Sequence, residues 1–145
     1  GNIGAAREAV SNAEGLDSDD ETLRGLNAVR GALMIKSGNY EAAIQSLTNA
    51  GETSDNLFNL GLAYLLNKDN QNAATSFEEA TELDNENALA YYGRAIAAAR
   101  TNNDTEMYDN LGRAVSLDPE LKQRALSDLE FRAYAENDQF RQALQ

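Results

Sequence analysis

The sequence predicts an all-α protein built from stacked antiparallel helix pairs. Three observations support this fold class. A helical unit recurs along the chain, the 145 residues contain a single proline, and few segments alternate apolar and polar residues as strands do. Repeats are weighed before single elements, because units that recur at a near-constant period stack on one another.

The recurring unit is a polar turn followed by a helix with three anchors. The second anchor comes four residues after the first, and the third is an alanine three residues later. The anchors are Ala6, Val10 and Ala13; Ala43, Leu47 and Ala50; Ala73, Phe77 and Ala80; and Met107, Leu111 and Ala114. The first anchors stand at positions 6, 43, 73 and 107, so the steps are 37, 30 and 34 residues, which is typical of helix hairpins. The chain is therefore expected to open on the second helix of a hairpin and to be part of a longer chain.

A further helix precedes each of the last three units, and each of these helices carries a glycine. Gly31, Gly61 and Gly93 are each followed three residues later by a large side chain. A glycine inside a helix costs about 1 kcal/mol relative to alanine. We interpret the three glycines as places where the missing Cβ lets the paired helix approach closely.

These residues resemble the tetratricopeptide repeat, a helix-turn-helix unit of about 34 residues with Leu-Gly and Tyr on its first helix and Ala, Phe, Ala and a final Pro on its second. The best match spans 57–85, with Leu57, Leu60, Gly61, Tyr64, Ala73, Phe77 and Ala80. Repeats are also assigned to 24–55 and to 89–119, the latter ending at Pro119 with a hairpin loop expected to be about two residues longer.

The resemblance implies one domain over 1–145, a right-handed superhelical solenoid. Residues 1–14 would be the second helix of a truncated repeat, and 119–145 a C-terminal capping hairpin. A further repeat cut short is the alternative for the last segment. Helices are expected near 2–14, 19–37, 40–50, 54–67, 70–82, 86–100, 104–116, 119–135 and 138–144. Asp118 and Pro119 favour a helix start at 119.

Composition limits the partners. A net charge of −12 opposes binding to nucleic acid and to anionic membranes. No apolar run is long enough to insert in a membrane. The makeup is acidic and cysteine-free, similar to that of some bacterial cell-envelope members of the family, which favours a bacterial periplasm or envelope over the cytoplasm.

The sequence offers little evidence for a catalytic or metal-binding site. The chain has no cysteine and no histidine. The acidic runs at 16–21 and 83–87 lack the glycine and the later glutamate of a calcium loop. Glu78 and Glu82 share a helix face and could form an acid–base pair, but such pairs are common on an acidic surface. The sequence therefore predicts neither an enzyme nor a bound cofactor.

The resemblance also implies a binding surface, because the first helices of such repeats line a concave groove that typically holds a peptide or helical segment. The groove residues assigned in this way are Ile35, Phe58, Asn59, Leu62, Leu65, Tyr91 and Arg94, with Ala28, Ala32, Ala90 and Ala97 beside them. Burial of Phe58, Leu62 and Leu65 as core is the competing interpretation. A carboxylate clamp like that of some family members would be incomplete, because Ala28 and Ala32 occupy its lysine and asparagine places.

Three hypotheses follow. The leading one is a noncatalytic interaction scaffold with a protein or peptide partner. The second is a structural self-association or assembly module of a larger envelope protein, with a homodimer through exposed terminal helices as one form. The third places an enzymatic domain on upstream sequence.

Overall fold

The computed structural model describes residues 4–5, 8, 10, 12 and 19–145, and all regular structure in these residues is helical. The elements are α2 (Asp20–Lys36), α3 (Tyr40–Thr48), α4 (Ser54–Leu66), α5 (Asn70–Leu83), α6 (Ala88–Arg100), α7 (Asp104–Leu117), α8 (Leu121–Ser127), the 3-10 helix η1 (Leu129–Tyr134) and α9 (Asp138–Ala143). Residues 4–5, 8, 10 and 12 are helical too. The rest of the helix predicted at 2–14, with its anchors Ala6 and Ala13, lies outside the described residues.

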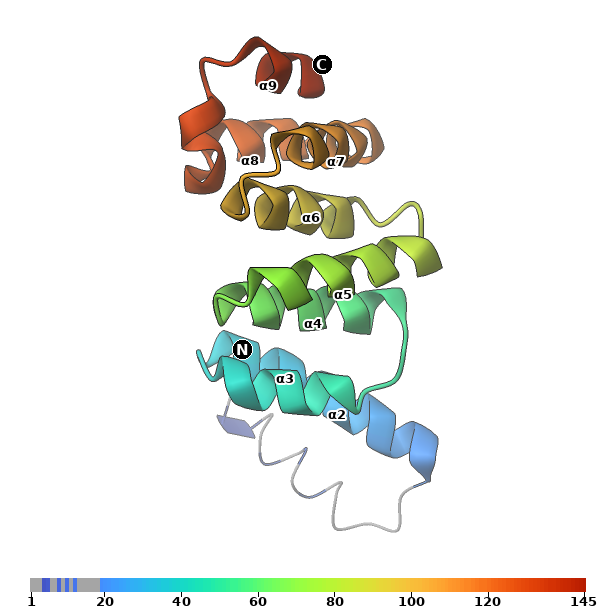
Figure 1. Ribbon diagram of the computed structural model, residues 1–145. Coiled ribbons are helices and arrows are strands. Elements are labelled where there is room, and N and C mark those ends of the chain that lie inside the picture. The colour runs from blue at the N-terminus through green and yellow to red at the C-terminus, as the bar shows by residue number, and fades with distance from the viewer. Residues whose placement is uncertain (1–3, 6–7, 9, 11, 13–18) are drawn as a thin grey trace.

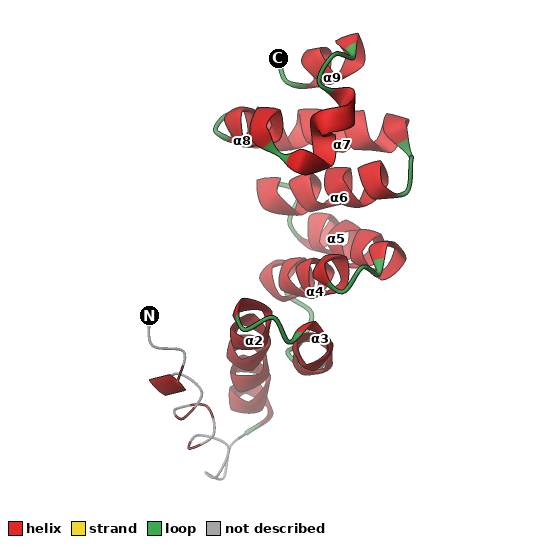
Figure 2. Ribbon diagram, turned by 90° about the vertical axis from the view of Figure 1, so that its left-hand side faces the viewer, coloured by secondary structure: helices red, strands yellow, loops and turns green. Residues whose placement is uncertain are grey.

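The helices form antiparallel pairs that stack into an elongated array (Figure 1). The pairs are α2 with α3, α4 with α5, and α6 with α7. Figure 2 shows α2 to the left of α3 and α4 to the left of α5, whereas α6 lies below α7. The predicted all-α fold of paired helices is confirmed.

Polar side chains fix where the helices begin. The residue before each helix from α2 to α7 accepts a hydrogen bond from the backbone N–H three residues later, which satisfies one of the amides that the first turn leaves without a partner. These capping residues are Asp19, Asn39, Thr53, Asp69, Asn87 and Asn103. The hydrogen bond from Thr22 also lowers the pKa of Asp19.

The loops inside the three pairs have equal lengths. Residues 37–39, 67–69 and 101–103 each join a first helix to a second. The middle residue of each loop has a positive φ: 75° at Gly38, 65° at Lys68 and 58° at Asn102. The prediction of a loop two residues longer in the third pair is therefore wrong, and equivalent residues of α4 and α6 are 34 apart.

This register changes the interpretation of one glycine. Ala95, and not Gly93, stands where Gly61 stands in the preceding pair. A Cβ at Gly61 would lie 2.7 Å from Cδ1 of Phe77 on its own partner helix, as the sequence predicts. A Cβ at Gly93 would lie 2.6 Å from the same ring, which belongs to the preceding pair. Gly93 thus makes room between pairs instead of within its own pair.

The main hydrophobic core runs from α4 to the C-terminal end. Its largest fully buried side chains are Phe77, Met107, Leu111, Phe131 and Phe140. The pairing of α2 with α3 has a smaller cluster of its own around Ala43 and Leu47, which also reaches Ala63 of α4. Each pair therefore depends on its neighbours for part of its buried surface, as expected of a repeat array.

The helix predicted at 119–135 is wrong as a single element. The chain breaks at Asp128, whose backbone is extended (φ −74°, ψ 129°), and continues as η1. The Asp128 carboxylate accepts hydrogen bonds from the N–H of Glu130 at 3.1 Å and from the Tyr92 hydroxyl at 2.9 Å. These bonds favour the break, because they draw η1 back against α6, where Phe131 meets the Tyr92 ring edge-on. The C-terminal segments α8, η1 and α9 together form what we call the cap.

Candidate functional site

Helix α4 packs closely against its neighbours on three sides and is more exposed on the fourth, where Leu62 still contacts the main core. Leu60 and Ala63 belong to the cluster of α3, and Gly61 faces Phe77 of α5. Leu65 lies in the main core. The remaining side carries four residues that are exposed or half-buried: Asp55, Asn59, Leu62 and Leu66.

The ion pairs of Arg94 show which side of helix α6 faces the second helices. Its guanidinium bonds Glu78 of α5 at 3.2 Å and Glu106 of α7 at 3.4 Å, so Arg94 points toward the second helices. At about 100° per residue, Leu89 and Ile96 lie 140° to 200° around the helix from Arg94 and face away from the second helices. Leu89 is exposed there, while Ile96 is almost covered.

The predicted groove residues are divided by these orientations. Ile35, Phe58, Asn59 and Leu62 are all half-buried on first helices. Phe58 also packs toward the core, with its ring centre 5.8 Å from that of Phe77. Leu65 is only 4% exposed and forms part of the core.

Tyr91 and Arg94 do not lie on the same side of the first helices as the other predicted groove residues. The Tyr91 ring lies under the guanidinium of Arg113 of α7 at 5.7 Å, and Arg94 is bonded between α5 and α7. Both side chains face the second helices, so the structure corrects their assignment to the concave side. The physical reason is the register of α6, because a shift of two residues turns a helix by about 200°. Ala90 and Ala97 are fully buried for the same reason.

The sequence reasoning missed several exposed apolar residues on the first helices. Val29 is 51% exposed, Leu66 37% and Leu89 42%. By the loop register they lie on the same side of their helices as Ala32 and Leu62. We call these five residues the first-helix strip. The aligned capping residues Asn39, Asp69 and Asn103 are the sequence signal that could have set the register and revealed the strip.

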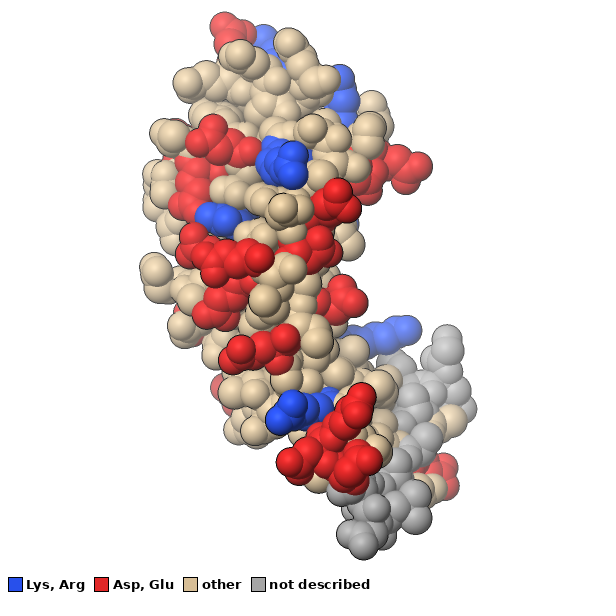
Figure 3. Space-filling view, turned by 90° about the vertical axis from the view of Figure 1, so that its right-hand side faces the viewer, with Lys and Arg blue, Asp and Glu red and all other residues tan. Residues whose placement is uncertain are grey.

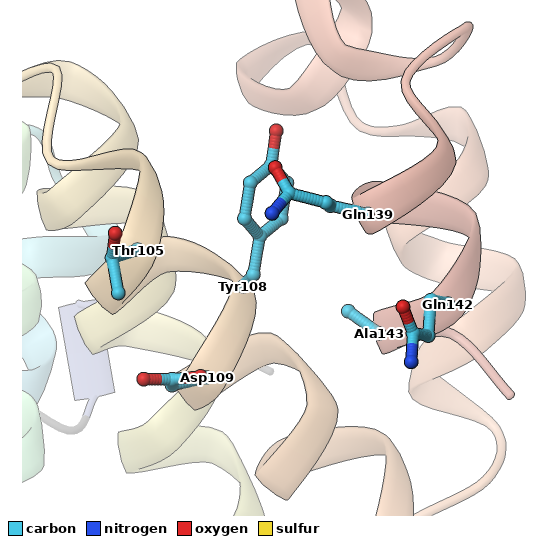
Figure 4. A pocket seen from close by; sticks show the side chains of 6 residues that line it. All are labelled: Thr105, Tyr108, Asp109, Gln139, Gln142 and Ala143. Atoms are coloured by element: carbon cyan, nitrogen blue, oxygen red, sulfur yellow. The ribbon is translucent and has the colours of Figure 1, made fainter.

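Two clefts lie near the first-helix strip or away from it: the first is remote from the strip, and the second adjoins it. One, of about 330 Å³, lies between α7 and α9 and is lined by Thr105, Tyr108, Asp109, Gln139, Gln142 and Ala143 (Figure 4). The Tyr108 hydroxyl there is covered and has no hydrogen-bond partner among the described residues, and burial raises the pKa of Tyr108. The other, of about 380 Å³, adjoins Leu66 and is lined also by Leu65, Lys68, Asn70 and Arg100. The pKa of Arg100 is raised, chiefly by its hydrogen bonds to Glu130.

Several of the acidic side chains considered for catalysis or metal binding are engaged in the helix framework, although Glu82 makes no ion pair with a described residue. Glu78 is paired with Arg94. Asp19 caps α2, and Asp84 accepts a hydrogen bond from the N–H of Glu86 at 3.0 Å. Within the described part of the chain, no three acidic side chains come close enough together to hold a metal ion.

The fold and the strip together define a helical-repeat protein with an exposed apolar side on its first helices. Residues 54–87 match the family model of the tetratricopeptide repeat. Residues 54–87 are therefore identified as one tetratricopeptide repeat, and the helix pairs on either side of it pack as in an array of such repeats. The crystal structure of MamA has the same fold, with a TM-score of 0.72 at 19% identity, and the match covers 98% of this chain and 82% of that one. No curated protein matches the chain.

Tetratricopeptide-repeat domains generally mediate protein–protein interactions. The fold is that of a scaffold and is typically noncatalytic. Among the described helices, none combines the length and the apolar character that crossing a membrane requires.

Proposed function

We propose that the chain is a noncatalytic scaffold that binds a peptide or helical segment of a partner protein along the first-helix strip. The observation that carries the proposal is the concentration of exposed apolar side chains there. Val29, Leu66 and Leu89 are large, exposed and placed on the side of three successive first helices that faces away from the second helices. Large exposed apolar side chains that share one side of successive helices favour an interaction site there.

The strip favours an apolar partner segment over an acidic one. Arg94, the cation assigned to the groove from the sequence, already bonds two glutamates on the side of the second helices. A partner on the strip would instead meet aliphatic side chains with Lys36 and Asp55 at its border. We expect an amphipathic helix with anchors three and four residues apart to fit this surface.

The test is capture from the native lysate on the immobilised chain, followed by mass spectrometry. The strip variant carries Val29→Gln and Leu89→Gln. The control carries Leu23→Gln, a comparably exposed leucine on α2 that lies off the strip. A partner retained by the control and lost by the strip variant supports the proposal. A partner retained by both variants refutes it.

We also propose the bacterial cell envelope as the location, on the strength of the acidic, cysteine-free composition alone. Fractionation of the native cells tests this proposal directly. Recovery with the cytoplasmic fraction would refute it.

A further inference from the structure

The cap carries an apolar projection with a positive charge. Leu129 at the start of η1 is 79% exposed, the highest value among the large hydrophobic side chains that the structure describes. Arg132 follows one 3-10 turn later and is exposed, without an ion pair to any described residue. The neighbouring acidic groups are already engaged, since Asp128 bonds Tyr92 and Glu130 bonds Arg100 through both carboxylate oxygens. We call Leu129 and Arg132 the cap projection.

A cleft of the opposite character lies between the α3–α4 connection and the end of α5. It has a volume of about 240 Å³ and is lined by Glu52, Leu57, Glu79, Glu82 and Leu83. Leu57 is buried at its base, and Leu83 at its edge is 58% exposed. None of the three glutamates makes an ion pair within the described part of the chain. We call this the α5 cleft.

The α5 cleft lies on an acidic face. Figure 3 shows the side of the molecule that bears the α3–α4 and α5–α6 connections, where Asp and Glu side chains outnumber Lys and Arg. Such a face repels most of this chain, whose net charge is −12. The cap is the exception, because residues 121–145 contain four basic and four acidic side chains.

We propose that the cap projection of one copy docks into the α5 cleft of a second copy. Leu129 would cover Leu57 and Leu83, and Arg132 would meet Glu79 and Glu82. Burial of the exposed leucines supplies the apolar contribution. The carboxylates and the guanidinium supply charge complementarity, which selects this partner surface and orients it.

The two surfaces cannot meet within one molecule. In Figure 1 the segment between α8 and α9 lies at the left edge, whereas the α3–α4 connection and the end of α5 lie at the right. The contact therefore joins two different patches of two copies. Such a heterologous contact leaves one projection and one cleft open on every dimer, so chains of copies grow unless they close into a ring.

The proposal goes beyond the scaffold function and does not use the first-helix strip. It replaces the predicted homodimer through terminal helices with a specific pair of surfaces. Because the contact is small, we expect weak association, in the micromolar to millimolar range. Higher salt should weaken it, since exposed charges are screened.

Sedimentation velocity of the 145-residue chain over that concentration range is the test. A projection variant carries Leu129→Gln and Arg132→Gln, and a cleft variant carries Glu82→Arg and Leu83→Gln. The control carries Leu23→Gln and Glu41→Arg, which make the same kinds of change at exposed positions on α2 and α3. All the substituted side chains are exposed, so the fold should be kept, and circular dichroism verifies this.

The expected result has two stages. Wild type and control associate, while each of the other two variants alone is weakened about tenfold or more. A mixture of the projection variant and the cleft variant then forms heterodimers and nothing larger, because only one intact projection and one intact cleft can meet.

Three results would overturn the proposal. They are a monomeric wild type at every concentration, unchanged association of either variant alone, and failure of the mixture to form heterodimers while the wild type associates. The Val29→Gln/Leu89→Gln strip variant should self-associate as the wild type does. A negative result for self-association would therefore leave the proposed scaffold function untouched, and the reverse also holds. A projection variant that also loses a captured lysate protein, with a monomeric wild type, would assign the cap to a different partner.

Discussion

The ring of Phe77 gives the sharpest stability prediction. This side chain is fully buried between α4 and α6, and two glycines face it. A Cβ at Gly61 would lie 2.7 Å from Cδ1, and one at Gly93 would lie 2.6 Å from both Cε1 and Cζ. The Phe77 ring is rigid and enclosed by α4 and α6, so it cannot avoid an added Cβ in the way that the end of a flexible side chain could. Gly61→Ala and Gly93→Ala should therefore each destabilise the array.

The magnitude follows from two opposing effects. Extra atoms in a well-packed core cost about 1–3 kcal/mol. Alanine gains back about 1 kcal/mol through its higher helix propensity. We expect a net loss of up to about 2 kcal/mol in the free energy of unfolding for each substitution. Gly25→Ala is the matched control, because it lies in α2 with nothing within 4 Å of the added Cβ, and it should stabilise the chain by about 0.5–1 kcal/mol.

A double-mutant cycle tests the cause. In the third pair, alanine already occupies the place of Gly61 and leucine that of Phe77, as Ala95 and Leu111. Phe77→Leu should therefore relieve the clash, and the double variant Gly61→Ala/Phe77→Leu should be about 1 kcal/mol more stable than the sum of the two single changes predicts. Urea unfolding followed by circular dichroism measures all four states. If Gly61→Ala and Gly93→Ala stabilise the chain as Gly25→Ala does, the reasoning about Phe77 is refuted.

Three further outcomes are expected. Burial and the bond to Asp128 raise the pKa of Tyr92 above its ordinary value of about 10, so its stabilising contribution is complete below that pH and is lost as the pH rises. Alkaline unfolding should be less steep with pH in Tyr92→Phe than in wild type. Arg94→Met should lower the unfolding free energy by about 1 kcal/mol in low salt and by less in high salt, because its two glutamate partners are partly exposed. Arg100→Gln should speed amide hydrogen exchange in η1, which Arg100 holds through Glu130, while exchange in α3 stays at the wild-type rate.

The fold was largely predictable because the repeated signals are local. Polar turns and anchors three and four residues apart each act within one helix, and together they predicted α2 to α7 to within about two residues. The break at Asp128 is only partly local, because the Asp128 carboxylate caps η1 by accepting a hydrogen bond from the N–H of Glu130. The contacts that hold η1 against α6 come from Tyr92 and Arg100, about thirty residues earlier in the chain, and the run from 119 to 135 alone does not indicate them.

The residues assigned to the groove on α6 point in a different direction from those assigned on α2 and α4 because of a single alignment. Gly93 was matched to Gly61 by residue type, although the loop residues Lys68 and Asn102 set a register two residues different. A shift of two residues moves a side chain to nearly the opposite side of a helix. Arg94 was therefore expected to be a ligand-binding cation, whereas in the structure its side chain forms ion pairs with α5 and α7.

The exposure of one equivalent strip position differs among the three first helices, and it indicates which of them a partner could contact most easily. Ala32 on α2 is exposed, Leu62 on α4 is half-buried, and Ile96 on α6 is nearly covered. Side-chain size alone does not explain the trend, because leucine and isoleucine have similar volumes. The cap adds to the packing of α6, because η1 contacts that helix through Phe131 and Glu130, and Ile96 belongs to the same core cluster as Phe131. A segment that binds the strip should therefore make its main contacts on α2 and α4, so that Val29→Gln alone should weaken capture more than Leu89→Gln alone.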